Sequence, residues 1–225
     1  MNDTQQEKQQ VYVNPAADVP KGLRIPAMIA SYVFHPVFMP VIMAIALYKL
    51  APLSFAGIDP RNISRWIAAI AVNTIMFPLL TIALLKGLGF IKSVHMHDAK
   101  DRIIPLIATM IFYFWAYLVI KNVQAPLILR TLILGSYLGV IIMFLVSIFY
   151  KVSMHTTAAG GMLGILIVLM MTGPINMQVP LFVAIILAGV MGTARLILKA
   201  HTPAQVWLGY ILGIAAMIAA HIYLK

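Results

Sequence analysis

Seven long apolar runs constrain this chain more than any other feature of its sequence. Crossing a hydrocarbon core of roughly 30 Å takes about 20 residues of α-helix, and several of the runs reach that length. Only 10% of the 225 residues are charged and 62% are hydrophobic, so the chain has too few polar groups to cover a water-soluble surface. Strand-like alternation is absent, which favours helices over a barrel. The sequence therefore predicts an all-α fold, a polytopic transmembrane helical bundle with six or seven spans.

We expect residues 1–24, which are polar and rich in glutamine, to form a disordered tail, and residues 25–225 to form one transmembrane domain. Prolines interrupt the first apolar run. If that run does not cross, the count is six and the tail lies on the other side of the membrane. His35 stands beside one of these prolines, and we favour a packing role for it over a functional one. The expected spans are Ile25–Leu50, Trp66–Leu85, Ile103–Ile120, Thr131–Tyr150, Ala158–Thr172, Leu181–Leu198 and Pro203–Tyr223.

The formal charge of +10 is concentrated near the ends of the apolar runs. This distribution suits anionic lipid headgroups or phosphate ligands. No arginine-rich stripe with interleaved aromatic residues is present, so the sequence does not favour nucleic acid as a partner. The chain has no cysteine, which excludes disulfides, thiolate catalysis and cysteine metal sites.

Three polar clusters interrupt the apolar pattern, around Arg102, around Ser153 and His155, and between Arg195 and His201. Two expected crossings separate each cluster from the next, so all three should emerge on one face of the membrane. Ionisable groups are expensive at such positions and usually mark a site. Cations together with neutral histidines suit the binding of a phosphate and the transfer of its phosphoryl group. The converging set is Lys100, Arg102, Lys151, Ser153, His155, Arg195, Lys199 and His201.

Helix starts strengthen the case for an anion site. Ser153, with Thr156 and Thr157, can cap the fifth span, and Thr202 followed by Pro203 is a good N-cap and N1 pair for the last span. Free backbone N–H groups at such starts bind anions readily. The small residues 158–161 that follow the first of these caps predict close helix packing at the centre of the bundle.

The spacing of these residues resembles the signatures of the type-2 phosphatidic acid phosphatase superfamily, the lipid phosphate phosphatases. Arg195, five residues and His201 are similar to the third signature, Arg-x5-His-x3-Asp. Ser153-Met-His155 resembles the second, Pro-Ser-Gly-His, and Arg102 with nearby Pro105 resembles the end of the first, Lys-x6-Arg-Pro. The likeness extends across nearly the whole bundle, in the same order.

The resemblance implies a metal-independent phosphatase without a cofactor. His201 would attack phosphorus and form a phosphohistidine, while His155 would protonate the leaving oxygen and later activate water. Arg102 and Arg195 would hold the phosphate oxygens with help from Ser153. The implied substrate is a membrane lipid phosphate or pyrophosphate, such as phosphatidate, phosphatidylglycerophosphate, a polyprenyl pyrophosphate or a lipid A phosphate. Bacterial members imply the inner membrane, with the site on its outer, periplasmic face.

The chain departs from the family pattern at several positions. Gln205 replaces the aspartate that would orient His201, Met154 replaces a glycine, and histidine stands at position 95 where lysine is expected. Lys100 or Lys151 could substitute for that lysine. We hypothesise that Asp98 or Asp101 reaches the histidine pair, or that Gln205 orients His201 through its amide oxygen. A degenerate relative that binds or moves an anionic lipid, and a lipid phosphotransferase, are the alternatives.

A metal site is a further alternative. His95, His97 and Asp98 are plausible ligands that His155 or His201 could complete. We favour the metal-independent reading because alternate positions on a helix point in different directions.

Overall fold

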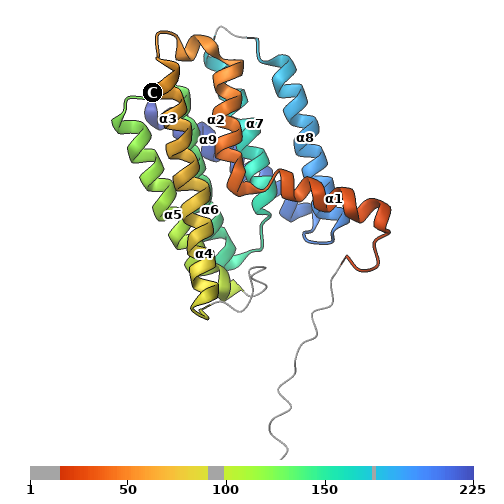
Figure 1. The fold of residues 1–225 in the computed structure, drawn as a ribbon. Helices are drawn as coiled ribbons and strands as arrows, with labels where there is room; N and C mark the ends of the chain where they lie inside the picture. The colour runs from red at the N-terminus through yellow and green to blue at the C-terminus, as the bar shows by residue number, and fades with distance from the viewer. Residues whose placement is uncertain (1–15, 91–98, 174–175) are drawn as a thin grey trace, which may run out of the picture.

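The computed structural model describes residues 16–90, 99–173 and 176–225, except for the side chains of residues 99–102. Regular structure in these ranges is helical (Figure 1). In chain order the elements are α1 (Lys21–Val33), η1 (Pro36–Phe38), α2 (Met39–Leu50), η2 (Pro52–Phe55), α3 (Pro60–Ala71), η3 (Val72–Met76), α4 (Phe77–Gly87), α5 (Ala99–Asn122), α6 (Leu127–Phe149), α7 (Met154–Thr172), α8 (Gln178–Ile197) and α9 (Pro203–Leu224).

Seven segments of the described chain are long and apolar enough to cross a membrane. Apart from α1 at the start of the first segment, their helices run along one another as a bundle, which confirms the predicted polytopic helical fold (Figure 1). The segments are Lys21–Leu50, Pro60–Gly87, Ile103–Asn122, Leu127–Phe149, Met154–Thr172, Gln178–Ile197 and Pro203–Leu224.

The first apolar run is not one continuous helix. It is broken between Val33 and Met39, where Pro36 begins a short 3-10 turn. Figure 1 shows α1 lying across the bundle, while α2 runs along it. The 12 residues of α2 rise only about 18 Å, less than the thickness of a hydrocarbon core. The prolines therefore produce a sharp change of direction rather than a gentle kink.

The second span begins earlier than the sequence predicts. The expected span begins at Trp66, but α3 already begins at Pro60, directly after Asp59. The Asp59 carboxylate accepts a hydrogen bond from the N–H of Arg61 at 2.8 Å, and Pro60 occupies N1, so the polar residues cap and start a helix. This span then passes through a π-helical turn, η3, before Pro78, whose missing N–H cannot bond the preceding turn.

The predicted central position of the small-residue segment is confirmed. In α7, 61% of an apolar stretch of 18 residues is buried, against 33% or less of the corresponding stretch in each of the other spans. Glycines let α9 lie directly against it. A Cβ on Gly213 would overlap the carbonyl oxygen of Thr157, and a Cβ on Gly209 would overlap Thr156. Because α7 and α9 run in the same direction, their N-termini lie at the same end of the bundle.

Candidate functional site

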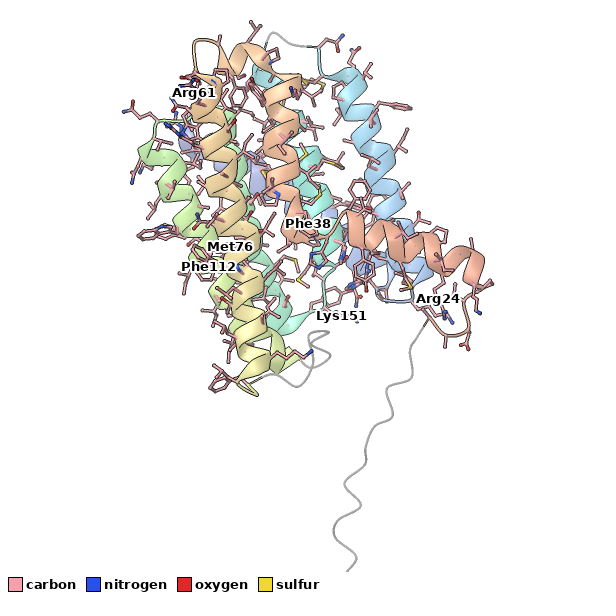
Figure 2. The ribbon with its side chains drawn as sticks, in the orientation of Figure 1. Arg24, Phe38, Arg61, Met76, Phe112 and Lys151 are labelled. Carbon is pink, nitrogen blue, oxygen red and sulfur yellow. The ribbon has the colours of Figure 1, made fainter. Side chains whose placement is uncertain are left out.

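The three polar segments lie at one end of the bundle. The start of α5, the start of α7 and the junction between α8 and α9 all lie there, because an antiparallel pair of helices separates each from the next (Figure 1). Lys151 marks this end in Figure 2, and Arg61 marks the opposite one. The chain topology therefore has the arrangement that the sequence predicts.

His155 reaches from the start of α7 to α1. Its Nε2–H donates to the carbonyl oxygen of Ser31 at 3.1 Å, since a carbonyl can only accept. In the neutral imidazole this contact leaves Nδ1 as the nitrogen that takes up a proton. The preceding Ser153 is fully buried, and its Oγ accepts from the N–H of Thr156 at 3.3 Å. Ser153 is therefore placed as the predicted helix cap, and not on a surface that a ligand can touch.

Arg195 converges on the same residue of α1. It lies in the last turn of α8, and its Nη1–H donates to Ser31 Oγ at 3.1 Å. The Nε of Arg195 is buried and has no hydrogen-bond partner among the described residues. A buried donor of this kind costs free energy unless a ligand or water accepts from it.

The end of α8 fixes where the chain goes after Arg195. Lys199 adopts a left-handed conformation, with φ of 49°. The N–H of Ala200 bonds the carbonyl of Arg195 at 3.1 Å, and the N–H of Lys199 bonds that of Leu196 at 2.9 Å. This pair of bonds is a Schellman motif, a helix ending that usually places glycine at the left-handed position. The turn leads directly to His201.

His201 is held by the start of α9. Thr202 caps this helix, and Gln205 completes a capping box. Gln205 Oε1 lies 3.2 Å from the N–H of Thr202 and 3.1 Å from Nδ1 of His201. Because Oε1 accepts from the backbone, the same oxygen accepts from Nδ1–H, so Nε2 is the ring nitrogen that carries the lone pair in the neutral imidazole. This contact is the one required if Gln205 orients His201.

His155 and His201 lie at the same end of the bundle, because α7 and α9 are parallel and each histidine lies close to the start of one of them. His35 is a third imidazole at this end. The ring of His35 lies edge-on to that of His155, with centroids 5.3 Å apart and planes at 85°. His35 accepts from the N–H of Val37 through Nδ1 at 3.4 Å.

Sequence reasoning assigned His35 to packing and did not single out Ser31. His35 follows Ser31 by four positions, but α1 ends at Val33, and His35 is extended as the N-cap of the turn that Pro36 begins. A serine and a histidine close together in an apolar run, just before a proline break, are the available signal. A small, largely apolar cavity also adjoins His155, with Phe34, Met39 and Met191 among its walls.

Several predicted site residues fall outside the described part of the chain. Asp98 lies outside the described residues, as do His95 and His97 of the metal alternative. The first turn of α5, at the same end of the bundle as the site, contains Lys100, Asp101 and Arg102. The structure does not describe the side chains of these three residues. Lys151 is exposed, and Lys199 pairs with Asp18 at 3.8 Å on the surface.

The described site is therefore positively charged and rich in imidazole. Only two carboxylate side chains are described, Asp18 on the surface and Asp59 at the opposite end. Such a site suits a phosphate or another small anion. Comparisons of this chain with protein-family models, with curated proteins and with solved structures find no match.

Proposed function

We propose that this protein is an integral membrane phosphatase that removes a phosphate from a lipid phosphate or pyrophosphate through a phosphohistidine. The observation that carries the proposal is that His155 and Arg195 both bond Ser31, and that His201 lies just before α9 at the same end of the bundle, although the two histidines are 46 positions apart in sequence. Binding of a phosphate would place an anion beside the guanidinium and beside the N-termini of α7 and α9.

The proposed chemistry uses the two imidazoles in different roles. Nε2 of His201, which carries the lone pair when Nδ1–H donates to Gln205, attacks phosphorus as the bond from phosphorus to the lipid oxygen breaks. His155, protonated at Nδ1, gives that proton to the leaving oxygen. Water then attacks the phosphohistidine while Nδ1 of His155 takes its proton, and the bond from phosphorus to nitrogen breaks to release phosphate.

The position of the site supports a lipid substrate. It lies at the end of an apolar bundle, where α1 crosses the other helices (Figure 1). The exposed Trp207 lies near the start of α9, with its ring 5.8 Å from that of Tyr210. Tryptophan and tyrosine are typical of the level of lipid headgroups. The bacterial inner membrane and its outer face are part of this proposal.

A second candidate function is binding or movement of an anionic lipid without cleavage. The specific observation that favours it is the partner of His201, because the neutral amide of Gln205 orients the ring but adds no charge to stabilise an imidazolium. Transfer of the phosphoryl group to another lipid would use the same site, with a lipid hydroxyl in place of water.

Phosphate release from a panel of lipid phosphates tests the proposal, with purified protein in detergent. We expect release from at least one lipid, and a loss of at least about a thousandfold in His201→Ala. His221→Ala is the matched control, because this histidine lies near the other end of the same helix α9. Lipid binding without release in the wild type would favour the binding function. Phosphate that appears on a second lipid would favour transfer.

A further inference from the structure

Ser31 on α1 forms hydrogen bonds with two site residues on other helices, His155 on α7 and Arg195 on α8. Its Oγ accepts from Arg195 and its carbonyl oxygen accepts from His155, each at 3.1 Å. The hydroxyl proton is directed elsewhere, to the carbonyl of Ala27 at 2.9 Å. A lone pair of Oγ is therefore turned toward the guanidinium, and one residue serves as acceptor for two separate donors.

The end of α1 explains why the carbonyl of Ser31 is available. In a continuing helix it would accept from the N–H of His35. That N–H bonds the carbonyl of Tyr32 instead, at 3.3 Å, and the next residue, Pro36, has no N–H. The last carbonyls of a helix need partners from outside, and the imidazole of His155 supplies one.

The surroundings of Ser31 suit a fixed contact. Ser31 is 7% exposed and Ala27, one turn earlier, is 5% exposed, whereas the apolar side chains of Ile29 and Tyr32 between and beside them are more than half exposed. The buried stripe of α1 faces α8, the helix that carries Arg195. A serine at the end of this narrow buried stripe is thus the polar group that α1 presents to the site.

We propose that Ser31 is a positioning residue that sets the Arg195 guanidinium and the His155 imidazole relative to each other, which makes α1 part of the phosphate site. The role in turnover rests on the proposed phosphatase function. The contact between Ser31 and Arg195 does not, and it can be tested separately.

A double-mutant cycle between Ser31 and Arg195 tests the inference in the active protein. Ser31→Ala removes the hydroxyl acceptor and keeps the carbonyl that holds His155. We expect it to raise KM for the lipid phosphate roughly tenfold and to change kcat less than about threefold, because the cation loses its orientation and the general acid does not. Ser31→Thr should restore KM. Adding Ser31→Ala to Arg195→Ala should cost nothing further.

Ser64→Ala is the matched control. Ser64 on α3 also donates to the carbonyl four residues before it, Pro60, at 3.1 Å, and lies near the end of the bundle opposite the site. Removing its hydroxyl should leave KM unchanged. Independent, additive effects of Ser31→Ala and Arg195→Ala would overturn the inference, as would a Ser31→Thr variant that behaves like Ser31→Ala.

Thermal unfolding and orthovanadate binding separate this inference from the proposed function. Each of these measurements can be made on the wild type, the two single variants and the double variant of Ser31→Ala and Arg195→Ala, and neither requires turnover. If the wild type releases no phosphate from any lipid, the phosphatase proposal fails, and a non-additive shift in melting temperature for Ser31→Ala and Arg195→Ala still supports the positioning role. If the wild type is active and both cycles are additive, the positioning role fails and the phosphatase proposal stands.

Discussion

Helices α7 and α9 on one side and α1 on the other all supply residues to the candidate site, but different contacts hold them in place. The backbones of α7 and α9 touch at glycines, so that even a methyl group on Gly213 has no room. Helix α1 packs on α8 through a stripe of small residues and contacts the site by hydrogen bonds from Arg195 and His155 to Ser31.

We infer from this difference that the pair α7 and α9 is rigid, whereas α1 can shift in position. Dense backbone packing gives α7 and α9 one register, so the starts of both helices keep a constant relation. A few polar contacts across a narrow stripe hold α1, and their geometry depends on single atoms. Substitutions in the first region should therefore disturb the whole bundle, and substitutions in the second should disturb the site first.

The largest effect should come from Gly213→Ala in the seam between α7 and α9. The new Cβ would meet backbone atoms of Thr157 and Gly161, which cannot move aside as a flexible side chain can. We expect a loss of about 3 kcal/mol in the free energy of unfolding, at the upper end of overpacking costs. Gly189→Ala on α8 is the control, because nothing lies within 4 Å of its Cβ. Equal melting temperatures for the two variants would contradict the account of this seam.

Ala27→Leu should displace α1 and disturb the site, with a smaller effect on stability than Gly213→Ala. Ala27 is buried on the stripe that faces α8, so a larger side chain must push α1 outward. We expect phosphate release to fall by about thirtyfold while the free energy of unfolding falls by about 1 kcal/mol. Met28→Leu, at an exposed neighbouring position, should leave both unchanged. If Ala27→Leu lowers the free energy of unfolding as much as Gly213→Ala does, the packing of α1 is not separate from the stability of the bundle.

Gln205→Ala should reduce turnover about tenfold, because His201 loses the acceptor that orients its ring. Gln205→Glu keeps the length and the capping box and adds the charge that Gln205 lacks, so its turnover should equal or exceed that of the wild type. Rates of phosphate release for the three proteins check this. A Gln205→Glu variant as slow as Gln205→Ala would argue against an orienting role.

The combined change of Asp98→Asn and Asp101→Asn should cost less than Gln205→Ala, since the amide contact to His201 is already present. The alternative in which a carboxylate reaches the histidine pair requires the opposite order, with a loss well beyond that of Gln205→Ala. Parallel rate measurements on both variants decide between the two.

The smallest effect should be a gain. Lys199 occupies a left-handed position that glycine adopts without strain. Lys199→Gly should raise the free energy of unfolding by about 0.5–1 kcal/mol, whereas Lys199→Ala should not. The exposed ion pair with Asp18 should matter little to either variant. A melting temperature that falls in Lys199→Gly would show that the side chain, and not the backbone, sets the role of this residue.

Much of the fold was predictable because its signals are local. Apolar length predicts the spans, and the residues at Ser153 and Thr202 predict where α7 and α9 begin. The common end of the three polar segments follows from counting crossings. The direction of α1 does not, because the angle after a proline break depends on which helix the segment packs against.

The contacts of Ser31 were also beyond prediction, for a similar reason. They join residues 124 and 164 positions apart in the chain, and nothing near Ser31 specifies either partner. The exchange of an aspartate for Gln205 was visible, but its dual bond to Thr202 and His201 emerges only when the helix cap forms.

The way α8 ends at Lys199 explains why five residues lie between Arg195 and His201. The Schellman turn takes up the residues after Arg195, and the cap of the next helix begins at Thr202, so the arginine and the histidine lie at the two edges of one connector of fixed length. The spacing of five residues is thus a measure of how much chain is needed to reverse direction at the end of the bundle. Lengthening that reversal by a single residue would change the position of His201 relative to Arg195, even with every side chain retained.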